Sequence, residues 1–191
     1  MILITGFEPF GGEKINTSAE VLRLLPETVA GIPVHKRLLP VVFGEAAETA
    51  LGELALRGPA EAVFLLGEAG GRETVTPELR ARNLRNARIP DNGGNQPVSQ
   101  PVLAEGPEEF VTPFPVRDIV ERMKAEGCAI EVSEDAGAYV CNDTFYLVGL
   151  KSGVPADFIH VPHRTENIGE LAETVGRFME LALRKMPVEA E

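Results

Sequence analysis

The sequence predicts a single-domain, three-layer α/β/α protein with a mainly parallel, twisted central sheet. Apolar runs of strand length alternate along the chain with stretches in which apolar residues recur every three or four positions. Such alternation is typical of strands joined by helices that cover both faces of one sheet. Because one hydrophobic core can still serve a chain of 191 residues, we expect one domain over residues 1–191.

The composition narrows the possible partners and the cellular compartment. Asp and Glu number 29 against 18 Lys and Arg, and the resulting net charge of −11 repels nucleic acids and anionic membrane surfaces. No apolar run approaches the roughly 20 residues that cross a bilayer, and the first residues lack the basic start of a signal peptide. Only two cysteines occur, which fits a reducing compartment. We therefore expect a cytoplasmic protein that binds neither nucleic acid nor membrane.

The chain is expected to begin with a buried strand and a capped helix. Residues 1–5 are apolar without alternation, as is typical of a strand buried on both faces. Thr17 and Glu20 have the spacing of a capping box, which predicts a helix over residues 17–25 that Pro26 stops.

A second strand and a second helix should follow, and then a third strand. Residues 33–39 form a strand-like run in which Val34 and the later leucines are expected to face the core. Residues 43–54 place their apolar side chains on one helical face. Residues 62–66 form another apolar run. The glycine-rich segment 67–71 should be the turn after its carboxyl end, where open α/β sheets usually bind ligands.

The middle of the chain is less regular. Residues 75–89 alternate polar and small residues, a pattern compatible with strand or helix, of which we favour extended structure. The irregular, proline-rich segment 97–115 carries Phe110, Val111 and Phe114. These apolar residues could close over a site, meet another subunit, or form a small core of their own beneath a long loop.

The last third of the chain returns to alternating elements. They are expected as a helix at 116–126, a strand at 129–132, a helix at 139–150 and a strand at 156–161. The helix at 139–150 is apolar nearly all round and should therefore be buried. A final helix begins at a capping-box pair, Asn167 and Glu170, and ends before Pro187.

Two cysteines are available for thiol chemistry. Cys128 begins the predicted strand at 129–132, a place where a thiol usually acts as a small buried hydrophobic group. Cys141 lies in the first turn of the predicted helix at 139–150, where free N–H groups and the positive end of the helix dipole favour a thiolate. A buried helix also accommodates an inert cysteine, so its position alone leaves both interpretations of Cys141 open.

Three histidines could supply a base. His160 lies near the carboxyl end of the strand at 156–161, so its backbone is held rigidly, as proton transfer requires. It could equally be a core histidine that bonds to backbone groups. His163 follows in a polar loop, and the two without a third ligand are weak evidence for zinc, so we expect no metal. His35 is expected to be structural or exposed.

A thiol–imidazole pair usually needs a third group that orients the ring. Glu78 is a candidate because it follows the glycine-rich segment 67–71 closely in the chain. Phe7 and Phe10 lie in the loop after the first strand. There they either pack beneath the loop or form the wall of a substrate pocket.

Several motifs occur in one order along the chain: GFEPFGG at 6–12, GEAGGR at 67–72, ARIPDN at 87–92, AGAYVCN at 136–142 and FIHVP at 158–162. Together they closely resemble the pyroglutamyl peptidase I family over nearly the whole chain. The resemblance implies a cytosolic cysteine peptidase that removes an N-terminal pyroglutamyl residue from peptides. It also implies that the enzyme needs no metal or other cofactor and assembles as a homotetramer.

The resemblance also implies roles for individual residues. It puts the nucleophile at Cys141, the base at His160 and the acidic third member at Glu78. The substrate-binding residues that it implies are Phe7, Phe10, Glu68, Arg88, Ile89, Tyr139 and Val140. Phe7 and Phe10 would form walls of the pyrrolidone pocket, and Arg88 would add to the electrostatics of the site. Glu68 stands where a neutral residue is usual, and its carboxylate could accept the lactam N–H or repel the lactam carbonyl.

Two other functions are compatible with the sequence. The segment 67–72 is superficially similar to a phosphate-binding turn, so a nucleotide-handling α/β protein is the main rival. However, the segment is not G-x-G-x-x-G and contains no Gly-Lys-Ser/Thr. The other possibility is an inactive homologue that binds pyroglutamyl peptides or acts as an oligomeric scaffold, and the presence of Cys141, His160 and Glu78 argues against it.

Overall fold

The computed structural model describes residues 1–164 and 166–185. Its helices are α1 Thr17–Leu24, α2 Glu45–Arg57, α3 Val116–Ala125, α4 Val140–Lys151 and α5 Ile168–Lys185. Its strands are β1 Ile2–Phe7, β2 Thr28–Val29, β3 Ile32–Leu39, β4 Ala62–Ala69, β5 Thr76–Pro77, β6 Arg80–Arg82, β7 Glu109–Val111 and β8 Ala156–Pro162. No helix within the described ranges is long and apolar enough to cross a membrane.

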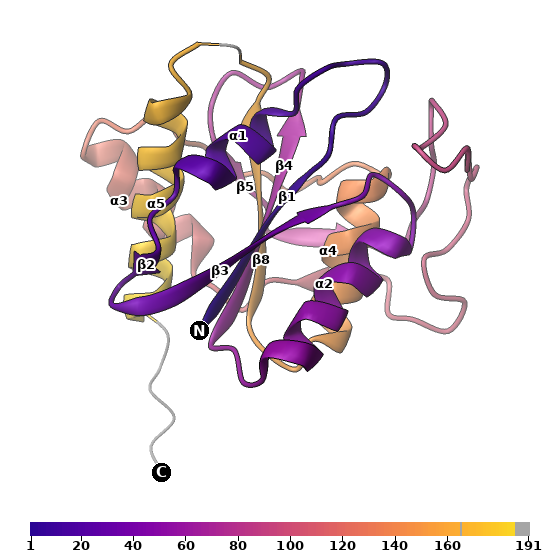
Figure 1. Ribbon diagram of the computed structural model, residues 1–191, viewed down its shortest axis with the longest axis horizontal. Coiled ribbons are helices and arrows are strands. Elements are labelled where there is room, and N and C mark those ends of the chain that lie inside the picture. The colour runs from indigo at the N-terminus through magenta and orange to yellow at the C-terminus, as the bar shows by residue number, and fades with distance from the viewer. Residues whose placement is uncertain (165, 186–191) are drawn as a thin grey trace.

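A six-stranded sheet forms the centre of the molecule, in the order β2-β3-β1-β4-β8-β5 (Figure 1). The four central strands β3, β1, β4 and β8 pair in parallel. The short strands β2 and β5 run antiparallel at the two edges. β6 and β7 form a separate two-stranded ribbon. The predicted mainly parallel sheet is therefore confirmed.

Successive residues of each central strand point to opposite sides of the sheet, so both faces carry apolar side chains. Helices cover both of these faces. Ile4 and Phe64 belong to a core shared with α1, α3 and α5. Leu3 and Leu65 belong to a second core, shared with α2 and α4. Figure 1 shows the two helix groups on either side of the strands. The three-layer α/β/α architecture is thus confirmed.

Each predicted helix is present within the described residues, close to its expected ends. The expected cap of α1 was wrong, because Asn16 and not Thr17 caps it. The Asn16 side chain accepts a hydrogen bond from the Ser18 N–H at 3.0 Å, and Thr17 is already helical. The predicted end of the last helix before Pro187 lies outside the described residues.

The strand at 129–132 was predicted wrongly. Ile130 makes only an isolated bridge to Val75, so no continuous ladder forms there. The expected inward orientation of the later leucines of β3 holds only for Leu39, since Leu38 is 46% exposed. β3 lies next to the sheet edge and is only partly buried along most of its length.

β4 is longer than the apolar run from which it was predicted. It continues through Ala69, so the segment 67–71 is part strand and turns only at its last residues. Residues 75–89 are mostly extended, as favoured, and contain the two short strands β5 and β6. The extension of β4 matters for the site, because it carries Gly67 and Glu68 alongside β8.

The proline-rich segment 97–115 packs on both cores of the same chain. Phe110 meets Phe145 of α4 edge-on, with ring centroids 5.4 Å apart. Phe114 stacks on Phe64 of β4, with ring centroids 5.2 Å apart. The segment therefore joins the two main cores rather than forming a small core of its own, while Val111 is 56% exposed.

We predict that Gly149→Ala lowers the free energy of unfolding by about 1–3 kcal/mol. Gly149 lies in α4, and a Cβ there would lie 2.4 Å from the Phe110 ring, which packs edge-on against Phe145 of the same helix. The measurement is urea unfolding followed by circular dichroism.

Gly52→Ala in α2 is the matched control, because a Cβ on Gly52 meets nothing within 4 Å. This helical glycine should gain about 0.5–1 kcal/mol of stability on conversion to Ala. Equal stability of the two variants would contradict the packing of Phe110 on α4.

Candidate active site

Cys141 is the second residue of α4, and its side chain is only partly exposed. Tyr139 is the N-cap of this helix and makes no side-chain cap bond, so the first-turn N–H groups have no partner at the cap. Nearly all of α4 is buried against the sheet. The helix therefore holds the thiol in a fixed place at its N-terminal end.

His160 lies on β8, on the same face as Phe158, which packs in the core beneath α4. Its backbone is held on both sides, by Gly67 of β4 in parallel register and by Thr76 of β5 in antiparallel register. A Cβ on Gly67 would lie 2.9 Å from Cys141 Sγ and 2.6 Å from the Phe158 ring. The missing side chain at Gly67 is therefore what leaves room for the thiol beside the strand that carries His160.

Glu78 follows β5 and is fully buried. Its backbone N–H donates to the Phe158 carbonyl at 2.8 Å, which draws it alongside β8. Its side-chain Oε1 lies 2.7 Å from His160 Nδ1. Because an ionised carboxylate can only accept hydrogen bonds, Nδ1 carries the proton and Nε2 is left as the basic nitrogen.

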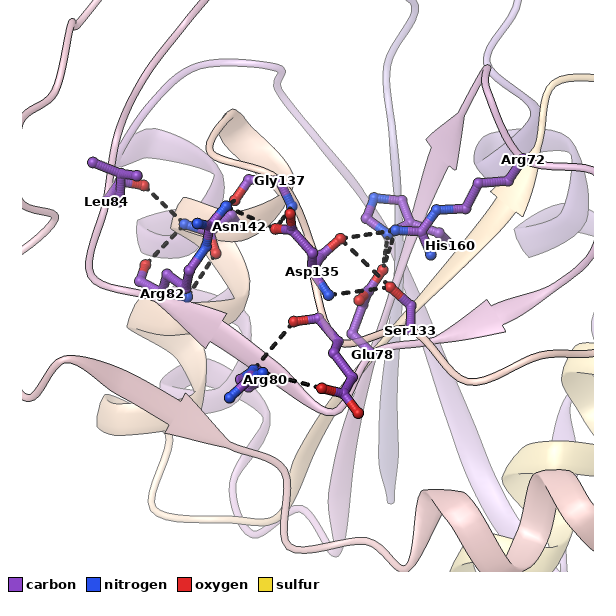
Figure 2. A network of polar contacts seen from close by, with 11 residues as sticks. Arg72, Glu78, Arg80, Arg82, Leu84, Ser133, Asp135, Gly137, Asn142 and His160 are labelled. Atoms are coloured by element: carbon purple, nitrogen blue, oxygen red, sulfur yellow. Dashed lines mark hydrogen bonds and ion pairs between the residues drawn. The ribbon is translucent and has the colours of Figure 1, made fainter.

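Arg72 reaches the same carboxylate from the segment after β4. Its Nη2 lies 2.9 Å from Glu78 Oε1 and also donates to the Asp135 carbonyl at 2.9 Å. Its Nη1 donates to the Thr76 hydroxyl at 2.5 Å. Figure 2 shows Arg72 and His160 converging on Glu78, with Asp135 on the side that leads to α4.

A cavity of about 440 Å³ opens between the carboxyl end of β4, the end of β8 and the start of α4. Both Cys141 and His160 line it, whereas Glu78 lies behind His160. Of the expected substrate-binding residues, those lining it are Phe7, Phe10, Glu68, Arg88, Tyr139 and Val140. Ile89 is not among the described lining residues and is 44% exposed next to Gly11.

The segment 67–72 does not have the geometry of a phosphate-binding loop. It begins as the end of β4 and leads to β5. The segment is therefore not followed directly by a helix whose N-terminus could bind a phosphate. It brings the carboxylate of Glu68 to the cavity wall together with the guanidinium of Arg72, which is already paired with Glu78. The geometry of this segment thus disfavours a nucleotide-handling function.

A family model for pyroglutamyl peptidase matches residues 1–186. The chain belongs to the pyroglutamyl peptidase family. Pyrrolidone-carboxylate peptidase 1 of Streptococcus pneumoniae serotype 4 is 40% identical over 180 residues, which span 92% of this chain and 84% of that protein. The pyrrolidone-carboxylate peptidase of Chromobacterium violaceum is 43% identical over 166 residues, which span 86% of this chain and 79% of that protein.

The fold of this family is also found in solved structures. The crystal structure of pyrrolidone carboxyl peptidase from Thermus thermophilus matches with a TM-score of 0.86 at 36% identity, covering 94% of this chain and 99% of that one. Pyroglutamyl peptidases are cysteine peptidases. The resemblance seen in the sequence motifs is therefore confirmed at the level of the family.

The resting thiol of this pyroglutamyl peptidase family member is neutral. Burial, together with the smaller effects of the negative charges of Glu78 and Glu68, raises the pKa of Cys141 from 9.0 to about 12, while Arg72 and a backbone hydrogen bond act in the opposite direction. The thiol must therefore lose its proton as it reacts.

Glu68 links the segments that surround the cavity. Its Oε2 accepts the Thr17 N–H of α1 at 2.6 Å, and its Oε1 lies 3.0 Å from Nδ1 of His163, beyond β8. His163 is thus paired with Glu68, whereas His160 is paired with Glu78. Only one of the two imidazoles lines the cavity together with Cys141.

The remaining cysteine and histidine lie away from the cavity. Cys128 packs against the core shared with α1, α3 and α5. His35 lies 2.8 Å from Glu53 of α2. Sequence reasoning did not single out Gly67 or Arg72, whose contacts join segments far apart in the chain.

We predict that Gly67→Ala lowers the activity of this peptidase on a pyroglutamyl substrate by about 100-fold, because the added methyl group displaces the Cys141 thiol. Gly52→Ala in α2 is the control, since a Cβ there meets nothing within 4 Å and Gly52 is not among the described lining residues of the cavity. It should retain activity close to that of the unchanged protein. Both rates are measured on folded protein, and an active Gly67→Ala variant would contradict the placement of Cys141 Sγ beside β4.

Proposed function

We propose that Cys141, His160 and Glu78 are the triad that removes an N-terminal pyroglutamyl residue from peptides through a thioester. The supporting observation is the pair formed by His160 Nδ1 and the buried Glu78, 2.7 Å apart, at a cavity whose wall also carries Cys141. Membership of the pyroglutamyl peptidase family supports the substrate class.

In the first step, Cys141 Sγ attacks the carbonyl carbon that follows the pyroglutamyl ring. The thiol is protonated at rest because burial raises its pKa to about 12. His160 Nε2 takes this proton as the S–C bond forms, and the Glu78 carboxylate stabilises the imidazolium that results. The negative charge moves to the carbonyl oxygen of a tetrahedral intermediate.

The first turn of α4 supplies donors for that oxyanion. The first intrahelical bond there runs from the Asp143 N–H to the Tyr139 carbonyl. The N–H groups of Val140 and Cys141 precede this bond, and both residues line the cavity. Arg88 also lines the cavity and adds a positive charge to its wall.

The intermediate collapses when the His160 imidazolium gives its proton to the leaving amine. The C–N bond breaks, the shortened peptide departs with a neutral amino terminus, and the pyroglutamyl group stays on Cys141 as a thioester. Water then attacks the thioester carbonyl while His160 accepts its proton. The second collapse releases pyroglutamate and returns the proton to the thiolate.

The cavity wall suits a flat, uncharged ring. Phe7 is almost fully buried, and the Phe10 and Tyr139 rings lie with centroids 6.1 Å apart. These aromatic groups provide apolar faces for the pyrrolidone. An ordinary N-terminal ammonium group would lose its hydration against the same faces, which favours the neutral lactam. Both oxygens of Glu68 already have protein partners at Thr17 and His163.

We also propose the setting in which the enzyme works. The whole chain would act as one peptidase domain, since the family model spans residues 1–186. Two free cysteines, one of them the proposed catalytic Cys141, suit the reducing cytoplasm. The resemblance to the family supports assembly as a homotetramer.

We predict that the folded, reduced protein hydrolyses pyroglutamyl-naphthylamide and leaves the glutamyl, prolyl and alanyl analogues intact. Release of naphthylamine measures the rate, and iodoacetamide should abolish it. If the protein does not hydrolyse the pyroglutamyl compound, the proposed function is wrong.

Matched variants assign the roles within that reaction. Cys141→Ser should lower the rate by about 1,000-fold or more, whereas Cys128→Ser keeps most of it. His160→Gln should lose activity and His163→Gln should not, because only His160 contacts Glu78. The reverse pattern in either pair would overturn that assignment.

For the assembly, we predict that sedimentation velocity at micromolar concentration detects a tetramer. A sample that contains only monomer at that concentration would contradict the homotetramer and would leave the peptidase reaction unaffected.

A further inference from the structure

The charge of Glu78 is compensated on one oxygen alone. Its Oε2 is buried and has no hydrogen-bond partner among the described residues. Its Oε1 meets both His160 Nδ1 at 2.7 Å and Arg72 Nη2 at 2.9 Å. A buried carboxylate with a single compensated oxygen is costly, so the groups at that oxygen decide its charge and its orientation.

Of these two groups, only Arg72 is charged throughout the reaction. His160 is neutral before the attack of the thiol and becomes a cation only afterwards. A guanidinium stays protonated under all conditions in which the protein is folded. In the resting enzyme, therefore, Arg72 is the cation that contacts Glu78.

Arg72 also reaches the chain that leads into α4. It donates to the Asp135 carbonyl at 2.9 Å, and Arg82 holds the Asp135 side chain at 2.8 Å (Figure 2). Asp135 and Gly137 line the cavity just before Cys141. One guanidinium thus joins the acidic member of the triad to the segment that delivers the nucleophile.

We propose that Arg72 is a positioning residue of the peptidase reaction, which keeps Glu78 ionised and aims its Oε1 at His160. This inference rests on the proposed function of the triad. The positive charge of Arg72 also repels the imidazolium cation of His160. This repulsion keeps the Glu78–His160 pair from binding its proton too tightly during transfer to the leaving amine.

The other ionisable groups near Glu78 do not replace Arg72. Cys141 lies on the cavity wall, and burial raises the pKa of its thiol to about 12. Glu68 is a second negative charge at the same cavity. Asp157 lies on β8, and its burial raises the pKa of this carboxyl well above the usual value. None of the three supplies a cation to Glu78.

The test compares Arg72→Met and Arg72→Lys in a Cys128→Ser background, which leaves one thiol. Arg72→Met should lower kcat/KM by about 10- to 100-fold, the effect of losing a hydrogen bond to a charged group. The acidic limb of its pH profile should move to higher pH, because a buried pair without its cation binds a proton more tightly. Arg72→Lys keeps the charge and should retain the pH profile of the unchanged protein.

A second readout does not depend on peptide hydrolysis. Arg72 lowers the pKa of Cys141, so alkylation by iodoacetamide at a fixed pH should be slower in Arg72→Met and not in Arg72→Lys. Arg80→Met is the matched control, since Arg80 binds Glu109 and Glu134 and forms no hydrogen bond or ion pair with the triad in the described part of the chain. Its alkylation and pH profile should stay unchanged.

The outcomes separate this inference from the proposed function. If the unchanged protein hydrolyses the substrate and Arg72→Met shows the same pH profile and alkylation rate, the role of Arg72 is wrong. If the pH profile of Arg72→Lys shifts as far as that of Arg72→Met, the role of Arg72 is also wrong, because a retained positive charge would then not preserve the profile. If the unchanged protein has no activity, the proposed function fails, and the alkylation rates still report on Arg72. Should Arg72→Met not fold by circular dichroism, Arg72→Gln takes its place with the same expected shifts.

Discussion

The pairing of β8 between β4 and β5 is the constraint on which the site depends. Parallel register places Gly67 beside His160, and antiparallel register places Thr76 on its other side. Glu78 then follows within reach of the imidazole, held by its bond to the Phe158 carbonyl. Because side chains alternate along a strand, a slip of one residue would turn His160 to the opposite face, away from α4 and Cys141.

Burial sets the electrostatics of the catalytic groups. The start of a helix favours a thiolate, yet Cys141 lies on a helix packed against the sheet, and the loss of hydration keeps its thiol protonated. The same burial makes the charge of Glu78 depend on the few groups that touch it. A neutral thiol with a pre-oriented base suits a reaction in which the proton moves as the S–C bond forms.

Local sequence patterns predicted the helices, because the signals for a helix lie within and directly beside its own residues. The helices follow from periodicity and from breakers, so each was found within a few residues, even though Asn16 and not Thr17 caps α1. The strand predicted at 129–132 failed because a strand exists only with a partner, and Ile130 finds a single bridging residue in Val75. For the same reason the sequence did not predict that β4 extends through Ala69, since this extension depends on pairing with a partner strand.

The sequence by itself determined the layered α/β/α fold and the family, because motif order and hydrophobic periodicity are properties of the chain alone. The resemblance of its motifs also proposed a nucleophile, a base and an acid. Only the tertiary structure decided that His160 and not His163 faces Glu78, that Gly67 makes room for the thiol, and that Arg72 shares the carboxylate with the imidazole. Those relations join segments separated by many residues. They arise from strand register and from packing, which no local stretch of sequence specifies.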